Sequence, residues 1–164
     1  MELFEAIKQR ASEREYQDKT VPDELLVKIV DAGRRAPTAR GVEPWRFVIV
    51  QEKKTLKEIA SFAENGAFIK NAAAVVAVFC QDTKYYLEDG CAATENILLA
   101  ATALGLGACW IAGDKKEYAP KIAQLLNAGQ ELKLVSIVAI GWPKQTSRQK
   151  KKLTVDQVLF REKI

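Results

Sequence analysis

Three polar residues early in the chain have the types and spacing to bind an anion. Arg10, Ser12 and Arg14 alternate along a segment that follows the first predicted helix, so in an extended backbone their side chains point to one side. Two guanidinium groups and a hydroxyl provide the charge-assisted donors that a phosphate monoester accepts. The alternative is a solvated cluster in which the arginines pair with Glu13, Glu15 and other acids. The pattern alone leaves both interpretations open.

The long connection APTARGVEPW at residues 36–45 is a second candidate. Connections of about four to six residues are typical, and this one is as long as the elements that it joins. Pro37 and Pro44 stiffen it. Gly41 permits unusual backbone angles or the close approach of a flat ligand, and Thr38 offers a hydroxyl. Such a rigid wall suits a planar ring, although a loop of this kind can also be only a connection.

Two further stretches have ligand-binding chemistry. The segment GLGACWIAGD ends a short strand with Ala112 and Gly113, whose backbone N–H groups are placed to donate to a ring nitrogen or a developing anion. Small residues can equally close a turn there. Lys150, Lys151 and Lys152 precede an apolar tail, and a solvated basic run is the default interpretation of such a cluster.

The composition limits the chemistry that the chain's own side chains can perform. Its 164 residues are 48% hydrophobic and 28% charged, which predicts a single globular domain over residues 1–164. Histidine is absent, which removes Ser-His and Cys-His nucleophilic pairs and the commonest metal ligand. The three cysteines form no C-x-x-C pair, so we expect reduced core residues and no metal site. If the protein is an enzyme, we expect a cofactor to carry the chemistry.

Charge and hydropathy argue against nucleic-acid and membrane partners. The net charge is only +4, and no aromatic-interleaved basic run or recognition motif is present. A basic start with an apolar signal core and an apolar run of about 18 residues are also missing, so we expect a cytoplasmic protein. A compact phosphorylated ligand would use the clustered basic residues more economically.

The apolar spacing predicts an α+β domain with a central sheet. Helical patterns cover residues 1–10, 21–33, 53–62, 85–104 and 117–126, and strand patterns cover residues 45–50, 74–80, 108–111 and 132–140. The helix at 85–104 is apolar around most of its second half, so it should be central and buried. The tail carries Leu153, Val155, Val158, Leu159 and Phe160, and it must cover its own domain or a partner.

In this order and spacing, these stretches resemble the nitroreductase family of FMN-dependent oxidoreductases over nearly the full chain. The similarity rests on R-x-S-x-R at residues 10–14, VPDELLVKIVDAGRRAPT, PW-x-F, DGCAATENILLAATALGLGACWI, I-G-W-P and a basic segment before V-D-x-V. The resemblance implies a central β-sheet flanked by helices. It also implies an intertwined homodimer with exchange of C-terminal tails and with two FMN sites at the subunit interface.

The resemblance also assigns cofactor contacts to both subunits. The residues expected at the ribityl phosphate and flavin edge are Arg10, Ser12, Arg14, Lys150 and Lys152. The residues expected against the flavin from the other subunit are Pro37, Thr38 and Ala39. The backbone at Ala112 and Gly113 is expected to face the reactive N5 region. Arg14 would stabilise the charge of reduced flavin, and no side chain needs to act as a catalytic acid or base.

The implied activity is ping-pong hydride transfer from NADH or NADPH through FMN to a small-molecule acceptor that is quinone-like, nitroaromatic or otherwise conjugated. Two alternatives remain on this fold. One is a relative that dehalogenates its substrate or fragments flavin, and the other is a flavin-binding or regulatory protein without turnover.

The chain departs from the family pattern in three places. Gly41 and Glu43 replace a common amide pair, with Arg40 beside them. Arg40 and Gly41 are therefore candidate substrate contacts, and Arg40 would attract a nicotinamide phosphate or an acidic substrate. The late basic pair is Lys-x-Lys, which lacks the arginine fork. The stretch 62–71 leaves little room for a helical lid, which predicts an open pocket.

Overall fold

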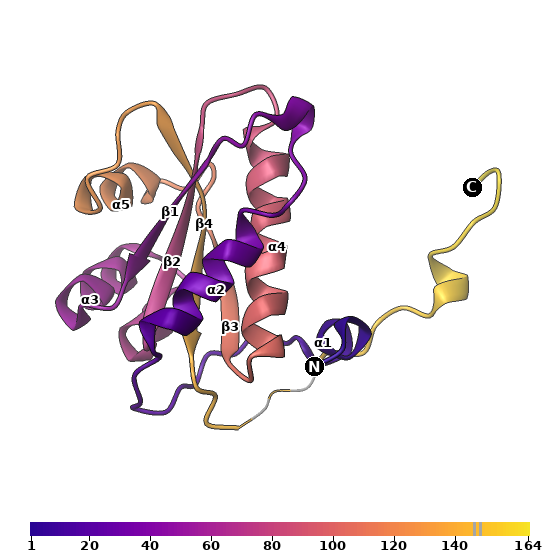
Figure 1. The fold of residues 1–164 in the computed structure, drawn as a ribbon, viewed down its shortest axis with the longest axis horizontal. Helices are drawn as coiled ribbons and strands as arrows, with labels where there is room; N and C mark the ends of the chain where they lie inside the picture. The colour runs from indigo at the N-terminus through magenta and orange to yellow at the C-terminus, as the bar shows by residue number, and fades with distance from the viewer. Residues whose placement is uncertain (146, 148) are drawn as a thin grey trace.

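One antiparallel sheet with the strand order β1-β2-β4-β3 organises the computed structural model (Figure 1). The structure describes residues 1–145, 147 and 149–164. The strands are β1 (Trp45–Val50), β2 (Ala74–Gln81), β3 (Gly107–Ala112) and β4 (Leu132–Gly141). In the central pair, Val76 lies opposite Val138, and almost every residue of β2 and β4 is buried.

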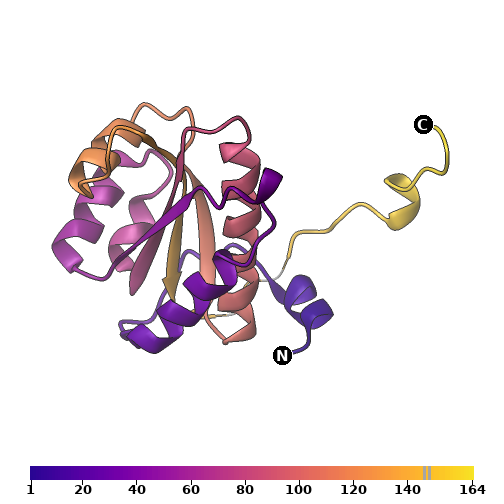
Figure 2. The same cartoon turned by 45° about the horizontal axis from the view of Figure 1, so that its top comes forward.

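Helices cover both faces of this sheet (Figures 1 and 2). One face packs against α2 (Asp23–Gly33) and α4 (Tyr86–Ala103), and the other packs against α3 (Lys53–Phe62) and α5 (Ala119–Leu125). Because strand side chains alternate between faces, the apolar run of β2 serves two cores. Val76 and Val78 join the first core, whereas Val75, Ala77 and Phe79 join the second. The predicted α+β fold with a sheet flanked by helices is confirmed.

Local sequence explains where the central helix ends. α4 is followed by Gly105, whose φ of +76° is unfavourable for other residues. The helix α1 (Leu3–Gln9) lies beside α4. Three short 3₁₀ turns were not predicted, namely η1 (Ala39–Gly41), η2 (Ala67–Asn71) and η3 (Val155–Gln157). The second of these turns occupies the stretch for which no helical lid was expected.

The C-terminal segment runs away from the body of the molecule (Figures 1 and 2). Its apolar side chains Leu153, Val155, Val158, Leu159 and Phe160 are 51% to 67% exposed. A compact monomer of 18.2 kDa would expose roughly 8,100 Å², whereas this chain exposes 10282 Å². The tail does not cover its own domain, and its covering of a partner stays a prediction.

Among the described residues, no helix combines the length and the apolar character that crossing a membrane requires.

Candidate functional site

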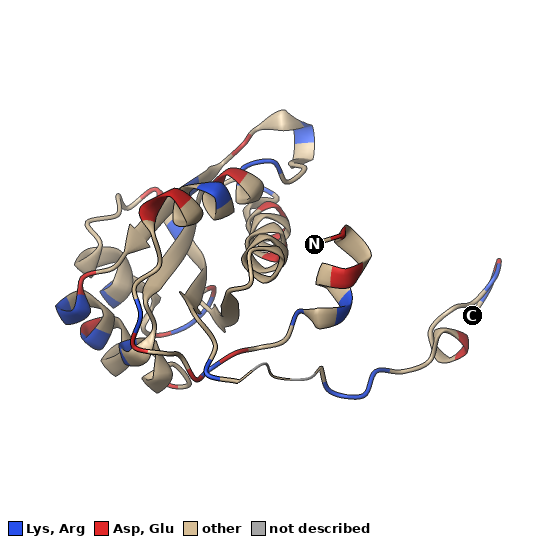
Figure 3. Ribbon diagram, turned by 60° about the horizontal axis from the view of Figure 1, so that its bottom comes forward, with Lys and Arg blue, Asp and Glu red and all other residues tan. Residues whose placement is uncertain are grey.

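Residues from two distant parts of the chain line one hollow of about 430 Å³. The lining residues are Arg10, Ala11, Ser12, Arg14, Ser147, Gln149, Lys150 and Lys152. We call this hollow the basic cradle. It brings together all five residues that the sequence assigned to the phosphate and flavin edge. Figure 3 shows the basic residues along both segments.

The first segment of the cradle is held against the edge of the sheet. Ser12 forms a parallel bridge with Ala108 of β3, and the Glu13 N–H donates to the Ala108 carbonyl at 3.0 Å. The Tyr16 hydroxyl donates to the Glu13 carbonyl at 2.7 Å and lies 3.3 Å from that of Ala139. Burial raises the pKa of Tyr16, so its hydroxyl remains a donor. The backbone of this segment is therefore extended, which is the conformation in which we expected Arg10, Ser12 and Arg14 to point to one side.

The second segment is tied to the first by side chains that the sequence analysis did not select. The Gln149 amide donates to the carbonyls of Ile7 at 2.8 Å and Arg10 at 2.6 Å. The Glu13 carboxylate accepts from the backbone N–H and the hydroxyl of Ser147, both at 2.6 Å. Glu13 is 6% exposed. The alternative in which Glu13 pairs with the arginines on the surface is therefore wrong.

The cations of the cradle have few acidic partners. The Arg10 Nε lies 3.8 Å from the Glu95 carboxylate of α4. The Arg14 guanidinium lies 5.8 Å from the centre of the Phe68 ring. Within the described part of the chain, no carboxylate lies within 4.0 Å of Arg14, Lys150 or Lys152. The hollow therefore carries a positive charge that its own acids do not neutralise.

The cysteines behave as core residues. Cys80 and Cys109 are buried, Cys91 is half-buried, and all three are free. Burial raises the pKa of Cys80 to about 12 and raises the pKa of Cys109 beside Ser12. These thiols stay protonated near neutral pH and are poor nucleophiles.

The far end of β3 offers one outward backbone donor. The Gly113 N–H donates to the Val135 carbonyl at 3.0 Å, so the prediction of a free donor at Gly113 is wrong. Because antiparallel neighbours alternate, the Ala112 N–H points away from β4 toward the sheet edge. The Ala112 carbonyl accepts from the Tyr118 hydroxyl. Gly113 still needs its small size, since a Cβ there would lie 2.6 Å from the Leu134 Cγ.

The loop at residues 36–45 lies at the N-terminal end of α4 (Figure 1). The Ala39 N–H donates to the Asp89 carboxylate at 2.9 Å, and Asp89 is buried. Two residues other than glycine, Arg40 and Glu43, have φ values of 62° and 50°. Such angles are costly and are kept only where surrounding contacts impose them. Pro37, Thr38, Ala39, Arg40 and Gly41 do not line the basic cradle in this chain.

Asp89, Glu13 and Gln149 are the site residues that the sequence analysis missed. Asp89 carries a weak signal, because it is an acid at a position that a helical pattern places among the buried residues of α4. Glu13 and Gln149 carry none, since their partners are distant in the sequence.

The family model described as "Putative TM nitroreductase" matches residues 2–164. The chain belongs to the nitroreductase family. The predicted family is confirmed, and with it the expectation of an oxidoreductase.

Relatives of this nitroreductase share both sequence and fold. A Methanothermobacter thermautotrophicus protein named "Putative NADH dehydrogenase/NAD(P)H nitroreductase" is 35% identical over 149 residues, which are 87% of this chain and 78% of that protein. A crystal structure of the same description from Parabacteroides distasonis has a TM-score of 0.93 at 28% identity, covering 99% of this chain and 98% of that one. A nitroreductase from Desulfovibrio desulfuricans, solved in complex with FMN, has a TM-score of 0.88 at 27% identity, covering 100% and 98%.

The residues present in this nitroreductase fit FMN. A phosphate monoester requires several cationic and hydroxyl donors, and the basic cradle supplies Arg10, Ser12, Arg14, Lys150 and Lys152. A flavin also needs a donor for its ring at some distance from its phosphate. The Ala112 N–H lies four residues along β3 from Ala108, which is roughly 13 Å at the usual rise per residue.

Proposed function

We propose that the protein is an FMN-dependent NAD(P)H oxidoreductase that reduces quinone-like, nitroaromatic or other conjugated acceptors by ping-pong hydride transfer. The main support is the basic cradle, in which the two predicted basic motifs line one hollow. The FMN complex of the Desulfovibrio relative supports the choice of cofactor. When bound, FMN supplies the hydride chemistry for which this chain has no side chain of its own.

In this proposal the cradle binds and orients the cofactor. Lys150 and Lys152 bind the phosphate with Arg10 and Ser12. Arg14 lies between the cradle and the Phe68 ring, and it stabilises negative charge on the flavin edge. The outward N–H of Ala112 faces the flavin near N5. None of these roles requires a catalytic acid or base.

The proposal includes a homodimer in which the tail of each subunit covers the other. Leu3, Phe4 and Ile7 of α1 are exposed together with the apolar residues of the tail. The surface in excess of a compact monomer is about a quarter of the expected area, which is more than the roughly 800 Å² that each partner buries in a standard protein interface. In such a dimer, Pro37, Thr38 and Ala39 would reach the flavin of the partner, with Arg40 and Gly41 beside the substrate.

Two measurements test the activity. Purified protein should be yellow and should release FMN on denaturation, and NADH or NADPH should bleach the flavin under anaerobic conditions. A colourless protein that cannot be reconstituted with FMN would refute the proposal. A yellow protein that neither nicotinamide bleaches would instead be a flavin-binding protein without turnover.

A further inference from the structure

The carboxylate of Glu13 is buried beside the basic cradle but does not line it. It is 6% exposed, and no cation of the described chain lies within 4.0 Å of it. Its partners are the backbone N–H and the hydroxyl of Ser147, both at 2.6 Å. A buried carboxylate without a cation is costly unless hydrogen bonds satisfy it. Among the described residues, Ser147 supplies both hydrogen bonds to the Glu13 carboxylate.

The surrounding sequence makes room for this contact. Gly107 lies at the start of β3, and a Cβ at that position would come within 2.7 Å of the Glu13 Cγ. The backbone of Glu13 is itself fixed by its hydrogen bond to Ala108 and by the hydroxyl of Tyr16. The carboxylate is therefore a rigid anchor, whereas Ser147 is exposed and depends on that anchor.

Ser147 precedes the two lysines of the basic cradle. Two attachments hold this part of the chain to the first segment, Glu13 to Ser147 and Gln149 to the carbonyls of Ile7 and Arg10. The exposed residues from Lys150 onward make no comparable contact with the body among the described residues. The position of Lys150 and Lys152 relative to Arg10 therefore depends on these two attachments.

We propose that Glu13 is a positioning residue for the phosphate of FMN: through Ser147 it holds the late lysines against the early arginines and so assembles the cradle. The inference rests on the proposed function, since it concerns the cofactor named there. Glu13 does not touch the phosphate. It acts through the backbone and hydroxyl of Ser147.

Electrostatics and positioning predict opposite results when Glu13 is changed. If only charge mattered, removing a carboxylate beside the cradle would strengthen the binding of an anion. If Glu13 positions the lysines, Glu13→Leu will weaken FMN binding by at least about tenfold, because two charge-assisted hydrogen bonds are lost. Riboflavin, which lacks the phosphate, should bind the variant and the wild type equally.

The experiment measures the dissociation constants of FMN and riboflavin for flavin-free protein by fluorescence quenching. Glu13→Gln retains an acceptor for the Ser147 N–H and a donor for its hydroxyl, so it should restore FMN affinity to within about threefold of the wild type. Glu15→Leu and Glu15→Gln are the matched controls, because Glu15 is exposed two residues away. Both controls should leave the ratio of the two constants unchanged.

Two other variants test the same contact if Glu13→Leu does not fold. Gly107→Ala should displace the Glu13 side chain and give the same selective loss of FMN affinity. Ser147→Ala removes only the hydroxyl donor and should give a smaller loss, of about threefold. Hydrogen exchange over residues 145–152 of the flavin-free protein should also be faster in Glu13→Leu and Gly107→Ala than in the wild type.

The outcomes separate this inference from the proposed function. If the wild type does not prefer FMN to riboflavin, the proposed function fails. If the wild type prefers FMN and the Glu13→Leu or Gly107→Ala protein binds FMN as well as or better than it, the positioning role is refuted. Equal losses for FMN and riboflavin would also refute it, because they would indicate a general structural defect.

Discussion

The two ends of β3 differ in how many of the proposed cofactor contacts a single chain brings together there. At the Gly107 end, residues 10–14 meet residues 147, 149, 150 and 152, and hydrogen bonds that involve Glu13 and Gln149 hold them together. At the Ala112 end, the N–H of the exposed Ala112 points away from β4. The 36–45 loop is anchored on α4 but does not reach the cradle. In the proposed function, a single chain thus supplies the residues that bind the phosphate, whereas the site for the ring needs further residues from a second chain.

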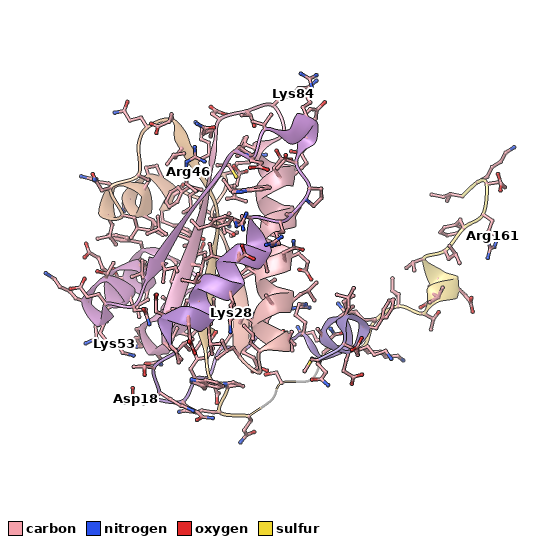
Figure 4. All side chains as sticks on the ribbon, viewed as in Figure 1. Asp18, Lys28, Arg46, Lys53, Lys84 and Arg161 are labelled. Atoms are coloured by element: carbon pink, nitrogen blue, oxygen red, sulfur yellow. The ribbon has the colours of Figure 1, made fainter. Side chains whose placement is uncertain are left out.

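The largest expected effect is a loss of FMN affinity on changing the basic cradle, at the Gly107 end of β3. Replacing Arg10 and Arg14 together with alanine should weaken FMN binding by about 3 to 6 kcal/mol, because each arginine contributes a charge-assisted interaction of about 1.5 to 3 kcal/mol. Equilibrium dialysis against FMN measures the change. Replacing exposed Lys28 and Arg46 (Figure 4), which lie outside the cradle, gives a control with the same change in charge. Unchanged FMN retention in the arginine double variant would remove the cradle as the phosphate site.

Removal of residues 153–164 tests whether a second chain supplies the residues that are missing at the Ala112 end of β3. Six large apolar side chains of this segment are at least half exposed, and their burial against a second copy would contribute roughly 3 kcal/mol or more. The truncated protein should sediment as a monomer at concentrations where the full chain is a dimer, with an unchanged circular dichroism spectrum. A full-length chain that is monomeric at high concentration would contradict the proposed dimer.

A substitution of Asp89 should affect the ring rather than the phosphate. Asp89→Ala leaves the half-buried Ala39 N–H without its partner, which costs about 1 kcal/mol and frees the 36–45 loop. FMN and riboflavin should therefore lose affinity equally, in contrast to the selective loss expected at Glu13. A loss confined to FMN would mean that the two ends are not separate sites.

A smaller effect is expected at Arg40. Its side chain is exposed, so a contact with the nicotinamide phosphate would be worth about 1 kcal/mol or less. Arg40→Gln should raise KM for NADPH up to about fivefold and leave KM for NADH unchanged, as measured by anaerobic flavin bleaching. Arg46→Gln on β1 is the control. Equal changes with both donors would exclude a role in donor selection.

The smallest effect concerns the hydrogen bond between Tyr86 and Asp114, which follows Gly113 in the sequence. The Tyr86 hydroxyl donates to the Asp114 carboxylate at 2.5 Å, and this bond raises the pKa of Tyr86 from 10.0 to about 12. Because the folded-state pKa is the higher one, the stabilisation is complete below pH 10 and is lost as the pH rises toward 12. The stability difference between the wild type and Tyr86→Phe should decrease over that interval in urea unfolding. A difference that is constant across it would show that the bond does not form.

The sequence predicted those parts of the fold in which local pattern and burial agree. The apolar run at residues 74–80 predicted the strand β2, and the predicted helices and strands begin and end within a few residues of the observed ones. The short turn η1 could not be predicted from local sequence, since it contains the positive φ of Arg40 and its first residue, Ala39, is hydrogen-bonded to the distant Asp89. The residues of R-x-S-x-R and the late lysines could be selected from the sequence because their side chains are typical of anion sites, and in the structure they line one hollow. The structure also revealed Glu13, whose environment is decided by a partner that is 134 positions away.

The cradle depends on residues that follow every strand of the sheet, and this has a consequence for biosynthesis. The ribosome completes β4 at Gly141 before it adds Ser147, Lys150 and Lys152. The proposed phosphate site is therefore among the last parts of the chain to be synthesised. In the proposed function, the protein can retain its cofactor only after these late lysines have been added.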